Sequence, residues 1–225
     1  MGAISLTTQN RLYWLGRYSE RVYTTIQMTL DQYDRLIEGE EHGRDAAAFC
    51  RDNGIPNLWS TNEEFTQHFM FDLSYPFSIY SNVENMLGNG MVLRETLSSP
   101  TLAYLQMARN AMEAASQSDG PMVQLQWVLD DIMAFRGSLD DEVSSDNIRN
   151  IVKTAASVER LSLMLRNSYR MDRFSAELMK FLNRLYKTDL PYDPDLLSEI
   201  NRVALEGAAI DPYRLTACIE GLFSV

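Results

Sequence analysis

Two Glu-Arg dipeptides, each inside a helical apolar pattern, are the features that most constrain this chain. Glu20-Arg21 ends the segment Leu-Tyr-Trp-Leu-Gly-Arg-Tyr-Ser-Glu-Arg, and Glu159-Arg160 lies within Ala-Ala-Ser-Val-Glu-Arg-Leu. A charge buried beside an apolar face is costly unless it is paired and hydrogen-bonded. The dipeptides therefore predict either a reciprocal ion-pair network between two core helices or a polar site between those helices.

Apolar residues recur at steps of three or four around both dipeptides, as on one face of a helix. The first stripe contains Leu12, Leu15, Tyr18, Val22, Ile26, Leu30, Tyr33 and Ile37. The second stripe contains Ile148, Ile151, Ala155, Val158, Ser162, Leu165 and Tyr169. We predict one long helix capped by Thr7 or Thr8 that ends near Ile37, before the acidic segment 38–43. The second long helix is expected to be capped by Asp146 and to continue as far as Tyr186.

Caps and prolines mark the starts of further helices. The expected starts are Asp45, the capping box Thr61 to Glu64, Ser74, Ser99-Pro100, Gly120-Pro121, Asp193-Pro194 and Asp211-Pro212. The helix from Ser74 should reach Leu97, with a kink at Gly88 or Gly90. No segment is typical of a strand and no linker separates two halves, so we predict one all-α domain over residues 1–225. Its helices should form an antiparallel bundle with the Glu-Arg helices in the core, and a pseudo-symmetric arrangement stays open.

The charge balance excludes some partners. The chain has 31 acidic and 20 basic residues, a formal net charge of -11. Lys and Arg supply the affinity for nucleic-acid backbones and for anionic membranes, so neither partner is expected. Only two cysteines occur, no secretion signal is visible, and no run approaches the ~18 apolar residues of a membrane span. These features predict a cytoplasmic protein.

Templates for enzymes and metal sites do not match the sequence. A carboxylate-bridged metal site in a helical bundle needs paired Glu-x-x-His motifs, and the chain has only His42 and His68. There is no phosphate loop and no dinucleotide fingerprint. We therefore expect no metal and no cofactor on this chain.

The motifs resemble those of a known family. The segment from Leu12 to Arg21 closely resembles the opening of the bacterial Alpha-E family, all-helical proteins named for a Glu-Arg motif. Val158-Glu159-Arg160 matches its second Glu-Arg helix, and Asn89 to Ser98 resembles its middle segment, usually Asn-Ala-Arg-x-Val-Arg. In that middle segment Met91 replaces the first arginine, whereas Arg94 remains. The resemblance spans about Leu6 to Arg170.

The resemblance implies a function as well as a fold. Alpha-E proteins are bacterial or archaeal, cytoplasmic, and commonly encoded beside a circularly permuted ATP-grasp ligase and a transglutaminase-like protein. ATP-grasp enzymes activate carboxylates as acyl phosphates and form amide bonds. The resemblance therefore implies a helical accessory or substrate-presenting partner in a peptide- or amide-forming modification system. ATP would be bound by the ligase and not by this chain.

Two interpretations of the Glu-Arg centre stay open. In the structural one, the dipeptides form a crossed ion-pair network that aligns the two long helices. In the other, surplus arginines make the centre an anion pocket, because guanidinium groups bind carboxylate or phosphate through paired hydrogen bonds. These surplus arginines are Arg17, Arg94 and Arg166. Arg17 lies three positions before Glu20, so these two can also pair on one helix.

Three functions therefore remain: an accessory protein, an enzyme of the same system, and a purely structural bundle that self-associates. In the enzyme, Glu20 or Glu159 would be the general base. The candidate binding residues are Arg17, Arg21, Arg94, Arg160, Tyr13 and Trp14. Aromatic residues with a polar tip favour interfaces, so the aromatic first helix predicts a docking patch for a ligase or for a second copy.

Overall fold

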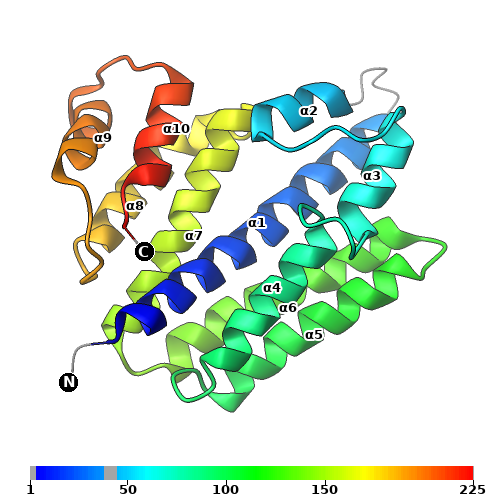
Figure 1. The fold of residues 1–225 in the computed structure, drawn as a ribbon, viewed down its shortest axis with the longest axis horizontal. Coiled ribbons are helices and arrows are strands. Elements are labelled where there is room, and N and C mark those ends of the chain that lie inside the picture. Colours follow the sequence, from blue (N-terminus) through cyan, green and yellow to red (C-terminus); the bar gives the residue numbers. More distant parts are fainter. Residues whose placement is uncertain (1–3, 38–44, 225) are drawn as a thin grey trace.

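The computed structural model describes residues 4–37 and 45–224, and within them it is all-α (Figure 1). The expected acidic segment 38–43 lies outside the described residues. An isolated β-bridge joins Tyr192 and Phe223. The helices are α1 (Leu6–Ile37), α2 (Ala46–Asn53), α3 (Asn62–Phe71), α4 (Ile79–Val92), α5 (Ser99–Ser116), α6 (Pro121–Glu142), α7 (Asp146–Asn167), the 3-10 helix η1 (Met171–Arg173), α8 (Phe174–Leu185), α9 (Pro194–Glu206) and α10 (Pro212–Gly221).

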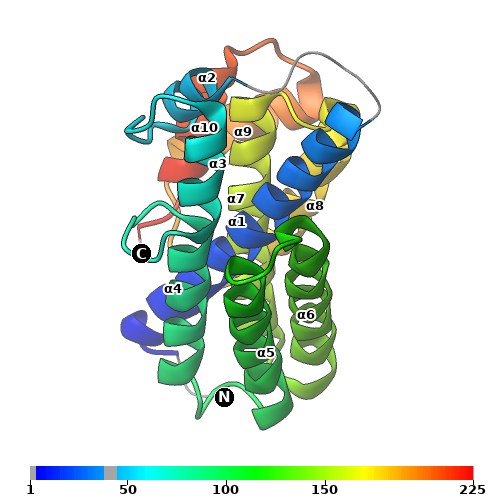
Figure 2. The same ribbon diagram turned by 90° about the vertical axis from the view of Figure 1, so that its right-hand side faces the viewer.

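The two Glu-Arg helices, α1 and α7, pack against each other at the centre of the bundle (Figures 1 and 2). Gly16 sets their separation, because a Cβ atom there would lie 2.2 Å from the carbonyl oxygen of Val152. The hydroxyl of Tyr169, just after α7, donates a hydrogen bond to Asp31 near the end of α1. Gly16 thus lies beside Val152, and the later residue Asp31 lies beside the later residue Tyr169. The two helices therefore run in the same direction, and the expectation of antiparallel packing is wrong for this pair.

Other neighbours do run antiparallel: α4 to α1, where Arg11 meets Asn89 and Arg21 meets Asn82, and α8 to α7, where α8 crosses from Glu177 beside Arg160 to Arg184 beside Ser157. On one side of α1 lie α4 and the α5–α6 hairpin; beyond α7 lie α8, α9 and α10 (Figure 1). Helices α2 and α3 cover the end of the bundle where α1 ends (Figure 1). One continuous hydrophobic core runs from Leu12 on α1 to Phe223 near the end of the chain. None of the described helices combines the length and hydrophobicity that crossing a membrane requires.

Most helix starts follow the predicted caps. Asp45, Thr61, Asp193 and Asp211 each accept a hydrogen bond from a backbone N–H in the first turn of the helix that follows. Gly120-Pro121 opens α6 as expected. Three caps lie earlier than predicted: the side chains that accept from the first turns of α1, α5 and α7 belong to Ser5, Ser98 and Ser145. A serine hydroxyl reaches the amide three residues later, so the preceding serine is the better cap in each case.

Two predicted helices are too long. Helix α4 covers only Ile79–Val92, because Pro76 and the Ser78 cap fix its start and the chain turns after Leu93. The helix continues through Gly88 and Gly90. Helix α7 does not reach Tyr186; it ends at Asn167, where Ser168 adopts a left-handed conformation with φ 49°.

The Glu-Arg centre and its two cavities

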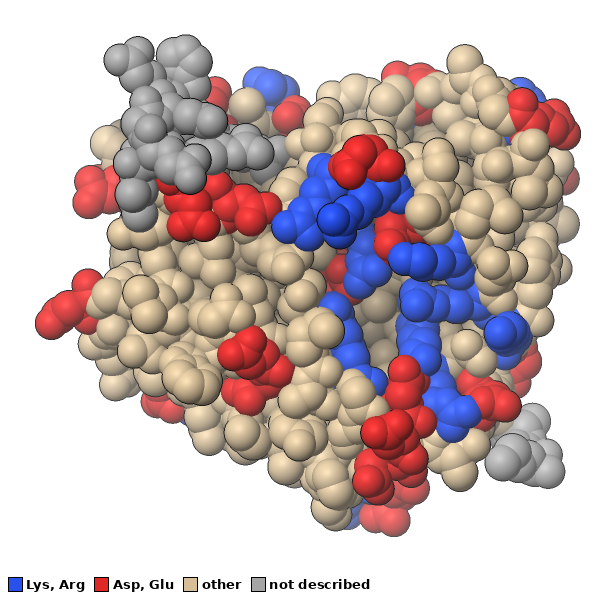
Figure 3. Space-filling model, turned by 180° about the vertical axis from the view of Figure 1, so that it is seen from behind, with Lys and Arg blue, Asp and Glu red and all other residues tan. Residues whose placement is uncertain are grey.

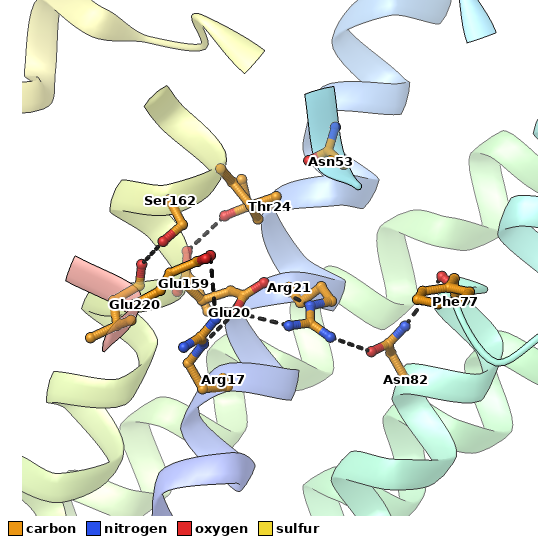
Figure 4. A network of polar contacts seen from close by, with 12 residues as sticks. Arg17, Glu20, Arg21, Thr24, Asn53, Phe77, Asn82, Glu159, Ser162 and Glu220 are labelled. Carbon is orange, nitrogen blue, oxygen red and sulfur yellow. Dashed lines mark hydrogen bonds and ion pairs between the residues drawn. The ribbon is translucent and has the colours of Figure 1, made fainter. Parts of the chain in front are cut away.

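The carboxylates of the two dipeptides lie between α1 and α7 (Figure 4). Glu20 is fully buried, and Glu159 is 4% exposed. The close approach of the two helices at Gly16 brings these carboxylates within reach of the opposite helix. The predicted position of the dipeptides is confirmed.

Each arginine of one dipeptide binds the glutamate of the other. Arg21 donates from Nε to Oε1 and from Nη2 to Oε2 of Glu159, at 2.6 and 3.1 Å. Arg160 donates from the same two nitrogens to the same two oxygens of Glu20, both at 2.8 Å. Paired bonds of this kind fix both distance and orientation. The expected crossed network is therefore present, and its two halves match atom for atom.

The match extends to the neighbouring helices. Nη1 of Arg21 donates to Asn82 on α4 at 3.2 Å, and Nη1 of Arg160 donates to Glu177 on α8 at 2.9 Å. Helix α4 packs beside α1, as α8 packs beside α7. The recurrence of the dipeptide thus corresponds to a local pseudo-symmetry in the structure.

A second arginine reaches each carboxylate from outside the dipeptides. Arg17 donates from Nε to Oε2 of Glu159, and from Nη1 to the Tyr13 hydroxyl at 3.2 Å. Arg136, on α6, donates from Nη2 to Oε2 of Glu20 at 2.7 Å. Arg17 therefore crosses to α7, and the expected pair with Glu20 on its own helix does not form.

The arginines hold both glutamates in the ionised form. Burial alone would raise the pKa of Glu159, but the positive charges of Arg17 and Arg21 outweigh it and lower the pKa to about 2. Burial likewise opposes ionisation of Glu20, and Arg136 with Arg160 lowers its pKa below the usual value. An efficient general base has a pKa near the working pH. Both carboxylates are therefore weak bases at neutral pH.

Arg94 lies outside this centre, so the prediction that it contributes to an anion pocket here is wrong. Because α4 ends at Val92, Arg94 falls in the turn that follows; its side chain is 69% exposed and contacts the adjacent Glu95 at 3.4 Å. The middle motif meets α1 through Asn89, whose side-chain oxygen accepts from Arg11 at 3.1 Å. Met91 is exposed.

The aromatic residues of α1 surround Arg17. Tyr13 is buried, and its ring lies edge-on to that of Trp14, with a centroid distance of 6.1 Å. The Arg17 guanidinium lies 5.9 Å from the Tyr13 ring and 5.8 Å from the Trp14 ring. Tyr13 is therefore part of the core and does not contribute to an exposed docking patch; Trp14 is only partly exposed.

Several residues at the centre carry no sequence signal strong enough to identify them. Asn82, Glu177 and Glu220 belong to no recognisable motif and stand among other polar residues of their helices. Glu220 binds Arg166 at 2.6 Å and lies 3.8 Å from Arg17. Arg136 has one weak signal, because it is the only basic residue of α6, a helix with five acidic residues.

Two cavities flank the centre on opposite faces of the α1–α7 pair. The α4 cavity, of about 180 Å³, opens toward α2 and α4; its charged lining residues are Arg21, Glu159, Arg166 and Glu220. The α8 cavity, of about 250 Å³, opens toward α6 and α8; its charged lining residues are Glu20, Arg136, Arg160, Arg170, Arg173 and Glu177. Helix α4 faces the viewer in Figure 1, and α6 and α8 lie behind.

The centre suits binding better than metal chemistry. Within residues 4–37 and 45–224, no group of three or more His, Cys, Asp or Glu side chains could hold a metal ion. His68 lies away from the centre, where it contacts Asp72 and stacks on Trp59. The charged groups beside both cavities are guanidinium groups and carboxylates, which bind oxyanions and cations respectively.

Comparison with known proteins identifies a family. A family model named Alpha-E, described as a predicted alpha-helical domain with a conserved ER motif, matches residues 7–189. No curated protein and no solved structure matches the chain. Both Glu-Arg dipeptides, and therefore the whole crossed network between α1 and α7, lie within the matched residues. The chain belongs to the Alpha-E family.

Proposed function

We propose that this chain is a helical accessory protein that presents an anionic substrate to an ATP-dependent, amide-forming ligase. One observation carries the proposal: both carboxylates of the Glu-Arg centre are buried and held by two arginines each, whereas arginines line cavities on either side. The centre thus lacks an available base but has groups that recognise oxyanions. Binding without catalysis is the activity that this arrangement supports best.

The enzyme alternative needs a base that can take a proton from a substrate. The arginines lower the pKa of Glu159 to about 2, which makes it a poor acceptor at neutral pH. Glu20 has its oxygens bound by Arg136, Arg160 and Thr24. A substrate would have to break these ion pairs before either carboxylate could act.

The reaction class comes from the family resemblance. Alpha-E proteins are commonly encoded beside an ATP-grasp ligase and a transglutaminase-like protein, and the ligase would activate a carboxylate as an acyl phosphate. In this proposal the ligase binds ATP, the helical chain binds the acidic substrate or its activated form, and both act in the cytoplasm. The transglutaminase-like protein is a second expected partner.

The test combines co-purification with an amide-forming assay. The tagged chain is isolated from its native host, and the ligase encoded beside it is assayed by mass spectrometry alone, with the chain, and with the chain but without ATP. We expect a complex with the ligase and ATP-dependent product that increases when the chain is added. Product from the chain alone would favour the enzyme alternative. No complex and an unchanged ligase rate would favour the structural, self-associating bundle.

A further inference from the structure

The α8 cavity carries a positive surplus on an acidic protein. Its lining includes four arginines and two glutamates, although the whole chain has a net charge of -11. One of these arginines, Arg170, also pairs with Asp31, an exposed carboxylate outside the lining, at 3.3 Å. Figure 3 shows Lys and Arg side chains gathered around a hollow on the face behind that of Figure 1. The α4 cavity has no such excess, since its lining contains two arginines and two glutamates.

Arginines at the opening of the α8 cavity have hydrogen-bonding capacity left. Arg173 is 66% exposed, and its ion-pair partner is the adjacent, exposed Asp172 at 3.9 Å, beyond hydrogen-bond range. Arg136 donates from Nη2 to Glu20 and from Nη1 to the Met133 sulfur at 3.7 Å, and it stacks 4.2 Å from the centre of the Tyr23 ring. A guanidinium has five N–H donors, so both side chains can bind a further acceptor.

Arg184 does not line the cavity, but the charge of Arg160, which does, acts on it. This half-buried arginine on α8 donates to the Ser157 hydroxyl at 2.9 Å, and none of the described carboxylates lies within ion-pair distance of it. Burial, and then the charge of Arg160, lower its pKa below the usual arginine value. The charges of Glu177, Glu20 and Asp140 act in the opposite direction, but none of these carboxylates pairs directly with Arg184, so an anion bound nearby would stabilise it further.

The charge and the volume of the α8 cavity limit which kind of ligand it can bind. A phosphoryl group carries about −1.5 to −2 charges at pH 7, which suits a lining with more arginines than glutamates better than the single charge of a carboxylate. Sites for drug-sized ligands are about 300–1,000 Å³, larger than this cavity of about 250 Å³. The site therefore has room for a small molecule or for one end of a longer chain.

We propose that the α8 cavity binds a phosphoryl group, with Arg136 and Arg173 as direct ligands and with Arg170 and Arg184 contributing positive charge. Met133, Met164 and Tyr169 line the same cavity and provide an apolar wall for the group that carries the phosphate. The inference deepens the proposed function, on which its biological meaning rests, because an acyl phosphate is the activated form that an ATP-grasp ligase makes. Binding itself can be measured without the ligase.

The test is a titration of the isolated protein at low ionic strength and pH 8, followed by the ¹H–¹⁵N signals of the arginine side chains. The probes are inorganic phosphate, acetyl phosphate and acetate. We expect both phosphates to shift the signals of Arg136 and Arg173, with acetate binding about tenfold more weakly. Equal affinities for the two phosphates would assign recognition to the phosphoryl group alone; tighter binding of acetyl phosphate would add a contribution from the apolar wall.

Matched variants distinguish this site from general charge attraction. Arg173→Gln should weaken phosphate binding about tenfold, and Arg173→Gln with Arg184→Gln should weaken it further. The control is Arg202→Gln on α9, an arginine that is 51% exposed and pairs with Glu199 on its own helix. Arg173 is on the surface, so its variant tests binding in a folded protein.

Three results would overturn the site: equal binding of acetate and phosphate, unchanged affinity in Arg173→Gln, or an equal loss in Arg202→Gln. The outcome is separable from that of the proposed function. Phosphate binding without a ligase complex would reject the partner and keep the site. A ligase complex without phosphate binding would reject the site and keep the partner.

Discussion

The two halves of the Glu-Arg centre share one hydrogen-bond pattern but differ in the charge around them. Around Glu159 the adjoining α4 cavity has equal numbers of arginines and glutamates in its lining. Around Glu20 the α8 cavity has twice as many arginines as glutamates. The shared hydrogen-bond pattern aligns α1 with α7, whereas the surplus of arginines lies only around the α8 cavity. This difference separates residues that hold the fold from residues that are available to a ligand.

The largest effect should come from Glu159→Ala. It removes the hydrogen-bonded partner of Arg21 and of Arg17, whose side chain is only 9% exposed and which would keep only the more distant Glu220, at 3.8 Å, among the described carboxylates. A buried charge left without its partner costs about 3–5 kcal/mol. Urea unfolding should show this loss, and Glu95→Ala, at an exposed glutamate, should stay within about 0.5 kcal/mol of the parent protein. A loss below about 1 kcal/mol would mean that Arg17 is stabilised in another way.

Acid should remove the stabilisation that ionised Glu159 contributes to the folded protein. Glu159 has a pKa of about 2 when folded, against about 4.3 in an unfolded chain. Its contribution, about 3 kcal/mol, is therefore complete above about pH 5 and is lost as the pH falls toward 2. The pKa of Glu20 is lowered too, so it acts in the same direction.

Urea unfolding at several pH values tests this dependence. Glu159→Gln, which cannot titrate, should unfold with a shallower dependence on pH between 5 and 2. A pH dependence equal to that of the parent protein would assign the acid sensitivity to other carboxyl groups.

Glu20→Ala should cost less than Glu159→Ala, although Glu20 is the more buried residue. Its partners, Arg136 and Arg160, face the α8 cavity and can be hydrated there, and Arg160 keeps its bond to Glu177. We expect a loss of about 2 kcal/mol in urea unfolding. The same variant should tighten phosphate binding, because it removes a negative charge from the cavity wall. Equal losses for the two glutamate variants would contradict the asymmetry between the halves.

The smallest effect should come from Arg94→Gln. Arg94 is exposed and pairs with the adjacent, exposed Glu95, so the free energy of unfolding should change by less than about 0.5 kcal/mol. Phosphate affinity should stay unchanged as well. A large change in either quantity would show that the end of α4 is coupled to the centre.

Local sequence signals account for much of the fold. Apolar periodicity predicted α1 and α7, and cap residues predicted the starts of α3, α6, α9 and α10, because these signals act within a few residues. The end of α7 was not predictable, since the left-handed residues there are Ser168 and Arg170 instead of glycine. The direction of α1 relative to α7 depends on the path of the intervening helices, which no local pattern encodes.

The candidate site was predictable in its centre but not at its edges. The two dipeptides could be identified from the sequence, because a charged pair inside an apolar stripe needs a partner. Arg136 and Glu177 are single residues on helices whose positions depend on tertiary packing, and Arg184 reaches Ser157 from another helix. The position of Arg94 was predicted wrongly, because the sequence motif does not show whether this residue lies inside α4 or in the turn that follows the helix.

The long separation between the two dipeptides has a consequence for biosynthesis. A chain is made from its N-terminus, so α1 is complete well before the arginines that neutralise Glu20, at positions 136 and 160, exist. Contacts between distant positions slow folding, since a long loop must close first. We expect the Glu-Arg centre to stay incomplete on the ribosome until α7 has emerged, so that its ion pairs form in one late step.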